Sequence, residues 1–305
     1  MKPRKVLRPL IKKSNQRTIQ VTPRKLAWPV MTGFLLLLGW ACAPWAEAQK
    51  TRQLPPSVRI HSDFKSQFLP KARQIFVYLP PGYQANEAKR YPVLYLFDGA
   101  NVFVTWEIDE TARVLVEASH IEPLIIVGVA HGGTQEDRTN EYTPTRVNGR
   151  GGKGDDLGRM LVEELKPFID REYRTLTDAP NTGLGGTSLG GLIALHIGLR
   201  HPKTFGKLAV MSPSVWWDRG VILSSVKALS AKPAQHIWLD VGTEEGRGMA
   251  ENAKRLRDAL TEKGWALDSD LYYFEDKRAG HEDIAWALRA PKVLKFLFPP
   301  SKVGK

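Results

Sequence analysis

Short apolar runs alternate with amphipathic segments along most of this 305-residue chain. Residues 91–97 and 123–130 are almost wholly apolar, which is typical of strands buried on both faces of a parallel sheet. The pattern predicts strands at 57–61, 73–79, 91–97, 123–130, 205–211, 236–241 and 270–274, the first two as an antiparallel pair, and helices at 110–120, 156–173, 189–197, 219–229, 249–263 and 283–298. This order favours an α/β fold in which helices cover both faces of a mostly parallel sheet.

Residues 131–154 depart from the pattern, because they lose apolar periodicity and gain glycine and charge. A connection of about two dozen residues is long for a compact domain, where loops of about 4–6 residues are usual. Such a loop is either a functional cover or disordered, and we favour a cover over the active site. In the helix that follows, we expect Asp155 or Asp156 to be the N-cap and Pro167 to kink or split the helix.

The N-terminal part has a different composition. Residues 1–48 contain nine basic residues and one acid, so they hold +8 of the formal net charge of +12. The uncharged run 26–46 after these basic residues predicts a secretory signal, cleaved after Ala48 at Ala46-Glu47-Ala48, or an uncleaved membrane anchor. The basic charge therefore indicates export to the periplasm or beyond, and it does not favour nucleic-acid binding. The single cysteine, Cys42, lies in this segment, so the mature domain would have no disulfide.

The candidate nucleophile is Ser188, in the sequence Gly186-Thr187-Ser188-Leu189-Gly190. This G-x-S-x-G pattern lies between a run of small residues and an apolar helix, which is the strand-turn-helix setting of a nucleophile elbow. Glycine on either side of the serine lets the backbone make a tight turn without a side-chain clash. The pattern predicts a serine nucleophile whose hydroxyl group stands clear of the sheet.

A serine nucleophile needs a histidine base and an acid that orients the base. In this fold the order along the chain is serine, acid, histidine. His281 fits the base, because it follows the last predicted strand in a loop that can reach the elbow. Glu245 best fits the acid, in the turn after strand 236–241, and Glu244 and Asp240 stay open as alternatives.

Two backbone amides are expected to bind the developing oxyanion. One is the amide of Leu189, directly after the serine, and the other is the amide of Ala100, after the third strand. We interpret Asp98 as a turn-shaping residue and not as a second catalytic acid. The stretch His131-Gly132-Gly133 follows the fourth strand, so we interpret it as the edge of the pocket.

Several motifs together resemble the putative-esterase family of α/β-hydrolases, which includes esterase D, siderophore esterases, feruloyl and acetyl-xylan esterases and mycolyltransferases. They are Arg73-Gln-Ile-Phe-Val-Tyr-Leu-Pro-Pro-Gly-Tyr83, Tyr91-Pro-Val-Leu-Tyr-Leu-Phe-Asp-Gly99, Arg138-Thr-Asn-Glu-Tyr-Thr-Pro144, the elbow, and Ser212-Pro-Ser-Val-Trp-Trp217. The last of these most resembles the siderophore-esterase branch. The resemblance spans about residues 57–298 and implies an α/β-hydrolase fold, a triad of Ser188, Glu245 and His281, and neither metal nor cofactor. Residues 49–56 are then a linker, and 299–305 a C-terminal tail.

The expected function is an exported serine esterase that acts on a small-molecule carboxylic ester, with membrane contact only through an uncleaved N-terminal segment. A siderophore or phenolic ester is the expected substrate, because Trp216 and Trp217 could face aromatic rings and Arg138 could bind anionic oxygens. For the two tryptophans, burial in the core is an equal alternative. An acyltransferase with the same triad and a non-catalytic binding protein on a hydrolase scaffold are the competing functions.

Overall fold

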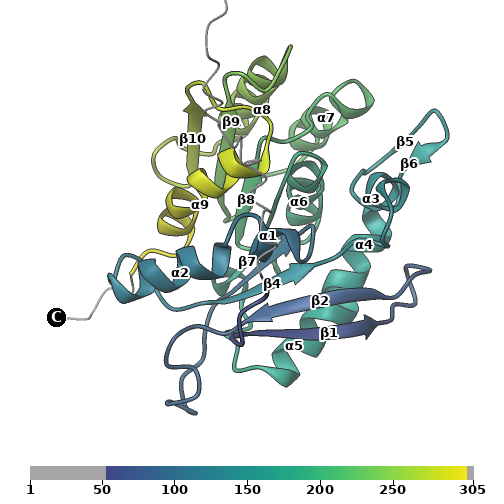
Figure 1. Ribbon diagram of the computed structural model, residues 1–305. Coiled ribbons are helices and arrows are strands. Elements are labelled where there is room, and N and C mark those ends of the chain that lie inside the picture. The colour runs from purple at the N-terminus through teal and green to yellow at the C-terminus, as the bar shows by residue number, and fades with distance from the viewer. Residues whose placement is uncertain (1–52, 301–305) are drawn as a thin grey trace, which may run out of the picture. The chain divides into compact units, whose positions relative to one another are not determined.

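The computed structural model describes residues 53–300, so the predicted signal or anchor lies outside the described residues. Their main feature is an eight-stranded sheet with the order β1-β2-β4-β3-β7-β8-β9-β10 (Figure 1). The strands are β1 Val58–Phe64, β2 Arg73–Tyr78, β3 Val93–Phe97, β4 Ile125–Val129, β7 Thr182–Thr187, β8 Lys207–Met211, β9 His236–Gly242 and β10 Leu271–Asp276. Each predicted strand corresponds to one of these, with ends that differ by a few residues.

The sheet is parallel except at one edge. β1 pairs antiparallel with β2, and β2 antiparallel with β4, whereas β4, β3, β7, β8, β9 and β10 run parallel to their neighbours. β3, β4 and β7 are buried along their whole length, which explains why their sequences do not alternate between apolar and polar residues. Because the parallel strands end at one edge of the sheet, the loops that follow them meet there.

Helices pack on both faces of this sheet, as the pattern predicted (Figure 1). One face is covered by α1 Asn101–Val104, α2 Ile108–Glu117 and α9 Asp283–Leu297. The other face is covered by α4 Gly154–Arg159, the π-helix η1 Met160–Leu165, α5 Lys166–Glu172, α6 Leu189–Arg200, α7 Val221–Lys227 and α8 Met249–Lys263. Two large apolar clusters, one on each face, form the core, and they hold the strand ends that carry the candidate site in fixed positions.

The helix predicted at 156–173 is a continuous helical segment made of three parts. It changes from α4 to the π-helix η1 at Met160 and back to α5 at Lys166, so that Pro167 lies in the first turn of α5. The helix therefore changes type just before Pro167 but is not interrupted, because proline is tolerated in the first turn of a helix. The predicted cap is wrong: Lys153 is the N-cap, and Asp155 and Asp156 lie in the first turn.

The prediction that residues 131–154 form a long irregular loop is wrong. This stretch contains the helix α3 Gln135–Glu141 and a short hairpin of β5 Arg146–Val147 and β6 Arg150–Gly151. Thr134 and Asp137 form a capping box at the start of α3, a polar signal that apolar periodicity does not register. The buried ion pair between Arg73 and Glu141 (2.8 Å) then fastens the end of α3 to β2.

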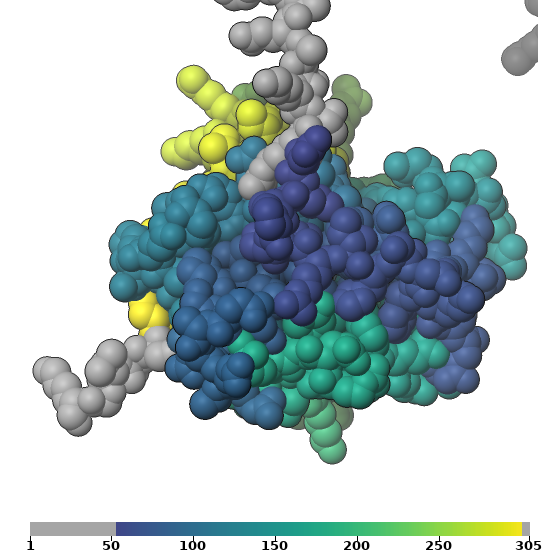
Figure 2. Space-filling view, turned by 60° about the horizontal axis from the view of Figure 1, so that its bottom comes forward, coloured from purple at the N-terminus to yellow at the C-terminus, as the bar shows by residue number. Residues whose placement is uncertain are grey.

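The segment from β1 to β2, in purple, is exposed across one face of the molecule (Figure 2). The helices within residues 53–300 are all too short or too polar to cross a membrane.

Candidate active site

Ser188 lies in the turn between β7 and α6, and its backbone has a φ of 58° and a ψ of −121°. A positive φ is strained for a residue with a side chain, and it is typical of a nucleophile elbow. A Cβ atom on Gly186 would lie 2.9 Å from the backbone carbon of Gly190, so this position has no space for a side chain. The glycines therefore allow a turn tight enough to raise the Ser188 hydroxyl above the strand end.

Three predicted side chains lie in one hydrogen-bonded row. Nε2 of His281 is 2.9 Å from Oγ of Ser188, and Nδ1 of His281 is 2.9 Å from Oε2 of Glu245. The side chain of His281 is 31% exposed, whereas that of Glu245 is fully buried. A carboxylate in this position can accept the Nδ1 hydrogen and so direct Nε2 of the ring toward the serine.

The carboxyl group of Glu245 has several other partners. Its Oε1 accepts hydrogen bonds from the Ser212 hydroxyl and from the backbone N–H of Gly242 (2.6 Å), and Arg289 Nη2 lies 3.3 Å away. Burial alone would raise the pKa of Glu245, but the hydrogen bonds from His281, Ser212 and Gly242 and the charge of Arg289 together hold it below its usual value. Glu245 is therefore a carboxylate at neutral pH.

The other two candidate acids have different surroundings. The side chain of Asp240 is fully buried, and Arg289 Nη1 donates to it at 2.8 Å. Burial raises the pKa of Asp240 to about 6, although Arg289 opposes this rise. Glu244 is exposed. Of the three acids considered, only Glu245 is hydrogen-bonded to His281.

The loop that carries the acid and the loop that carries the histidine are bonded directly to each other. The backbone N–H of Arg278 donates to the Thr243 hydroxyl at 2.9 Å, and the N–H of Glu244 donates to the carbonyl of Ala279 at 3.0 Å. Since these loops follow the parallel neighbours β9 and β10, their pairing continues that of the strands. Glu245 and His281 are thus positioned as one unit.

The two predicted oxyanion amides lie in segments that follow β7 and β3. Leu189 is the first residue of α6, and the amide of a first helical residue has no acceptor within its helix. Ala100 directly precedes α1, in a turn where Asp98 has a φ of 70°. The backbone N–H of Asp98 donates to the Tyr142 hydroxyl at 3.0 Å, which fixes this turn against the segment after α3. Asp98 therefore shapes the turn, as interpreted from the sequence.

An open cavity of about 420 Å³ surrounds the Ser188 hydroxyl. It is lined by Asp98, Asn101, His131, Gln135, Arg138, Thr187, Ser188, His281, Asp283 and Trp286. Most of these side chains are polar, so the cavity offers hydrogen bonds rather than an apolar slot. His131 forms part of the edge, as predicted, and burial lowers its pKa, although the nearby Asp98 and Glu141 oppose this effect.

Arg138 lines the cavity, but its charge is already paired. Its Nε and Nη2 donate to the two carboxylate oxygens of Asp98 at 2.6 and 2.9 Å, in a bidentate arrangement. Both side chains are mostly buried, at 17% and 14% exposed. Arg138, which we expected to bind anionic oxygens of a substrate, is therefore already neutralised by Asp98. The pair presents a polar surface to the cavity.

The two tryptophans do not line this cavity. Trp217 is 8% exposed, and its indole N–H lies 3.2 Å from both the carbonyl and the hydroxyl of Thr145. The structure thus assigns Trp217 to packing against the segment that leads into the β5–β6 hairpin. Trp216 is 51% exposed, so it is not part of the core.

Sequence reasoning missed Asp283, which links distant segments at the site. Asp283 Oδ1 accepts hydrogen bonds from Asn101 Nδ2 at 2.8 Å and from Trp106 Nε1 at 2.9 Å. These bonds tie the start of α9, two residues after His281, to the α1 segment that carries the predicted oxyanion amide. The position of Asp283 at a helix start directly after the base is the signal that could have indicated it.

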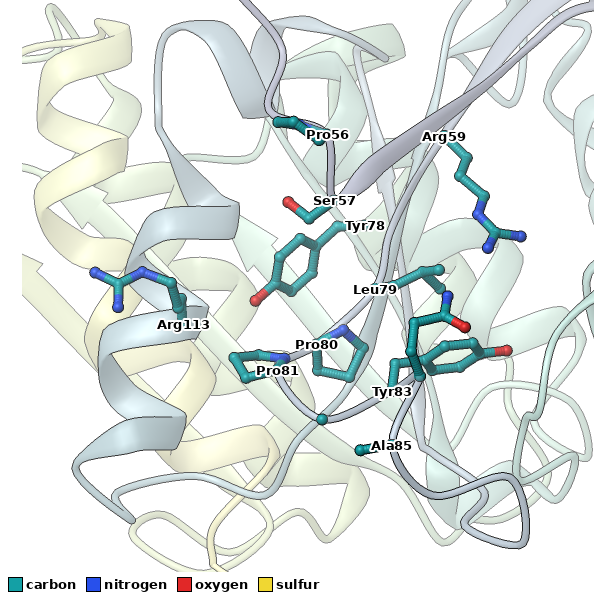
Figure 3. A pocket seen from close by; sticks show the side chains of 12 residues that line it. Pro56, Ser57, Arg59, Tyr78, Leu79, Pro80, Pro81, Tyr83, Ala85 and Arg113 are labelled. Carbon is teal, nitrogen blue, oxygen red and sulfur yellow. The ribbon is translucent and has the colours of Figure 1, made fainter.

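A second cavity, of about 470 Å³, lies at the end of the strands opposite to Ser188, and Figure 3 shows the side chains that line it. It surrounds Tyr78, whose strand β2 ends beside the start of β4. Its lining includes Pro80, Pro81 and Tyr83 but no histidine, so it has no nucleophile and base pair. Within residues 53–300, no three His, Cys, Asp or Glu side chains are grouped as metal ligands would be.

The sequence and the structure are both similar to known esterases. A family model described as putative esterase matches residues 66–295. Ferri-bacillibactin esterase BesA of Bacillus subtilis is 31% identical over 239 residues, which are 69% of this chain and 80% of that protein. An endo-1,4-beta-xylanase/feruloyl esterase of Xylanibacter ruminicola is 26% identical over 243 residues, 77% of this chain but 30% of that protein. The solved structure of BES protein from Bacillus cereus has a TM-score of 0.68 at 24% identity, and the match covers 82% of this chain and 98% of that chain.

Proposed function

The chain belongs to the putative esterase family, and from this membership we propose that it hydrolyses a carboxylic ester through an acyl-enzyme formed on Ser188. The observation that carries the proposal is the row of hydrogen bonds from Ser188 through His281 to Glu245, with both distances at 2.9 Å. A non-catalytic binding protein would have no need for this geometry.

In the proposed reaction, Nε2 of His281 takes the Ser188 proton while Oγ attacks the carbonyl carbon of the ester. The amides of Leu189 and Ala100 donate hydrogen bonds to the oxyanion that forms. The bond to the alkoxy group then breaks, and His281 returns the proton to the leaving alcohol. Water repeats the same steps on the acyl-enzyme and releases the acid. Glu245 stays ionised throughout, because its hydrogen bonds and Arg289 hold its pKa low.

Replacement of the nucleophile tests this mechanism. Ser188→Ala should lower kcat by roughly 10⁴–10⁶, as in other serine hydrolases, because the acyl-enzyme cannot form. A fluorophosphonate probe should label the wild-type protein and not the variant. Ser225→Ala removes a hydroxyl that bonds only within α7, so it is a matched control that should keep full activity and labelling. Labelling of folded Ser188→Ala would disprove the assignment.

For the substrate, we infer a bulky polar ester, such as a catecholate siderophore or a feruloyl ester. The polar lining of the 420 Å³ cavity supports this class, because a long alkyl chain gains little from such a surface. Two relatives, named as a ferri-bacillibactin esterase and a feruloyl esterase, are consistent with it.

A substrate panel separates this proposal from a general esterase. We expect kcat/KM for a trilactone siderophore or a feruloyl ester to exceed that for p-nitrophenyl butyrate. Gln135→Ala and Arg138→Ala should narrow this difference, because the first removes a polar side chain from the cavity lining and the second leaves the Asp98 carboxylate unpaired there. Trp217→Phe, which changes a packed residue outside the cavity lining, should leave the ranking unchanged. Butyrate as the best substrate in all four proteins would contradict the substrate class but not the triad. Product analysis with added alcohols tests the acyltransferase alternative.

A further inference from the structure

Arg289 is a buried cation close to the hydrogen-bonded row of Ser188, His281 and Glu245. It lies in the middle of α9 and is 1% exposed. An unpaired charge in such a place is very costly, so its contacts decide whether the helix can pack there. Its Nη1 donates to Asp240 at 2.8 Å, while its Nη2 donates to the Ser212 hydroxyl at 3.0 Å and lies 3.3 Å from Glu245 Oε1. The guanidinium thus joins two buried acids.

Ser212 follows β8, is fully buried, and has a φ of 42°. Its hydroxyl oxygen lies 3.0 Å from both Trp286 Nε1 and Arg289 Nη2. Indole and guanidinium nitrogens only donate hydrogen bonds, so they occupy the two lone pairs of the oxygen. The single hydrogen of the hydroxyl must therefore point to Glu245 Oε1, its remaining partner. The direction of this hydrogen bond is fixed by the chemistry of its neighbours.

The same contacts reach the base. The ring of Trp286 packs edge-on against the ring of His281, with centroids 5.0 Å apart and planes at 88°. Trp286 therefore touches the imidazole with its ring and Ser212 with its N–H. One oxygen of Glu245 faces His281, and the other faces Ser212, so rotation of the carboxyl group would break bonds at both ends.

We propose that Ser212 and Arg289 are positioning residues of the triad, which fix the rotation of the Glu245 carboxyl group and keep it ionised against His281. The proposal rests on the proposed function, since it assigns these residues to the same reaction. Neither residue lines the cavity around Ser188, so they act through Glu245 and, for Ser212, also through Trp286, whose ring packs against His281.

The charges around this group set the expected pH effect. Arg289 is faced by Asp240 from β9, Glu245 from the loop after it and Asp276 from β10 (3.8 Å), while His281 shares its cavity with Asp98, His131, Arg138 and Asp283. Arg289 is one of the groups that hold the pKa of Glu245 down. Without it, the pKa of Glu245 rises, and the carboxyl group is protonated over a wider range of pH.

Arg289→Met tests the charge. We expect the acid limb of its kcat/KM profile to move to higher pH, because a protonated Glu245 no longer orients His281. Titration with a fluorophosphonate measures the concentration of active sites. A loss of folded protein would lower that concentration but would not move the acid limb of the kcat/KM profile. Ser225→Ala is the control. An acid limb at the wild-type pH in folded Arg289→Met would overturn the role of Arg289.

Ser212→Ala tests the hydrogen bond with a smaller change, for the case that Arg289→Met does not fold. We expect kcat to fall roughly 5- to 50-fold with little change in KM, since one charge-assisted hydrogen bond to Glu245 is lost. Unchanged kcat in Ser212→Ala, together with inactive Ser188→Ala, would overturn the positioning role and leave the proposed mechanism intact. Active Ser188→Ala would instead disprove the mechanism itself.

Discussion

At the scale of single residues, the site depends on which of two adjacent glutamates turns inward. Glu244 is exposed, whereas the side chain of Glu245 is fully buried and reaches His281. The backbone N–H of Gly242 accounts for part of this difference, because it donates to Oε1 of Glu245 and to no other acid named here. A Cβ on Gly242 would lie 2.3 Å from the carbonyl oxygen of Ala279, so only glycine allows the two loops to approach this closely.

This arrangement predicts a clear ranking of three substitutions. Glu245→Gln should lower kcat by roughly 10²–10⁴, because the ring of His281 loses the group that orients it while the oxyanion amides stay in place. Glu244→Gln should keep kcat within about twofold of wild type, as expected of a solvated side chain. The kcat of Asp240→Asn should lie between those of the other two variants, because Asp240 is linked to Glu245 through Arg289. Steady-state kinetics at neutral pH measure all three, and full activity in Glu245→Gln would remove this residue from the triad.

At the scale of elements, α3 closes one side of the cavity and is fastened at two points. Arg138 pairs with Asp98 in the turn after β3, and Glu141 pairs with Arg73 of β2. The second pair is the more buried, with side chains 0% and 5% exposed. Removal of one partner from such a pair leaves the other charge buried and uncompensated.

Arg73→Met should therefore lower the free energy of unfolding by about 3–5 kcal/mol. The double substitution Arg73→Met and Glu141→Leu should recover much of this loss, because no isolated charge is left. Arg159→Ala, which breaks an exposed pair with Glu163, is the control and should change stability by less than about 1 kcal/mol. Urea unfolding followed by circular dichroism measures each value. Equal stability of Arg73→Met and Arg159→Ala would show that the buried pair does not hold α3.

At the scale of the whole molecule, buried and half-buried histidines link stability to pH. Burial is the largest cause in each of four cases, and it lowers the pKa of His61, His131, His196 and His201 below 6.5. The unfolded chain then binds more protons than the folded chain just below pH 6.5, so their contribution is present above that pH and lost as pH falls. Asp240 changes the stability in the opposite direction, because its pKa is raised in the folded chain. This effect is confined to the range between about pH 4 and pH 6.

The free energy of unfolding should consequently fall between pH 7.5 and pH 6. Urea unfolding at half-unit steps of pH measures this slope. His196→Gln should make the slope shallower, since it removes a buried histidine whose pKa is lowered by burial, although its contact with Asp155 opposes that effect. Stability that rises from pH 7.5 to pH 6 would contradict the assignment of these histidines as neutral in the native state.

Much of this protein could be derived from its sequence, because the features concerned are local. Buried strands, amphipathic helices and the glycine-flanked Ser188 depend on neighbours in the chain, and the order of serine, acid and histidine limits which strand ends can contribute. These patterns were sufficient for the α/β fold, the elbow and the loops that carry Glu245 and His281. The capping box of α3 was also local, but it is polar and short, so a search for apolar periodicity passed over it.

The tertiary structure decided what depends on contacts between distant segments. Which of Glu245, Glu244 and Asp240 contacts His281 follows from how the loops after β9 and β10 approach each other. Arg138 is neutralised because the turn after β3 places Asp98 beside α3, 40 residues away along the chain. Arg289 lies 49 residues from Asp240, yet both are buried together. No local pattern encodes such pairs, because their energies arise only when packing removes the charges from water.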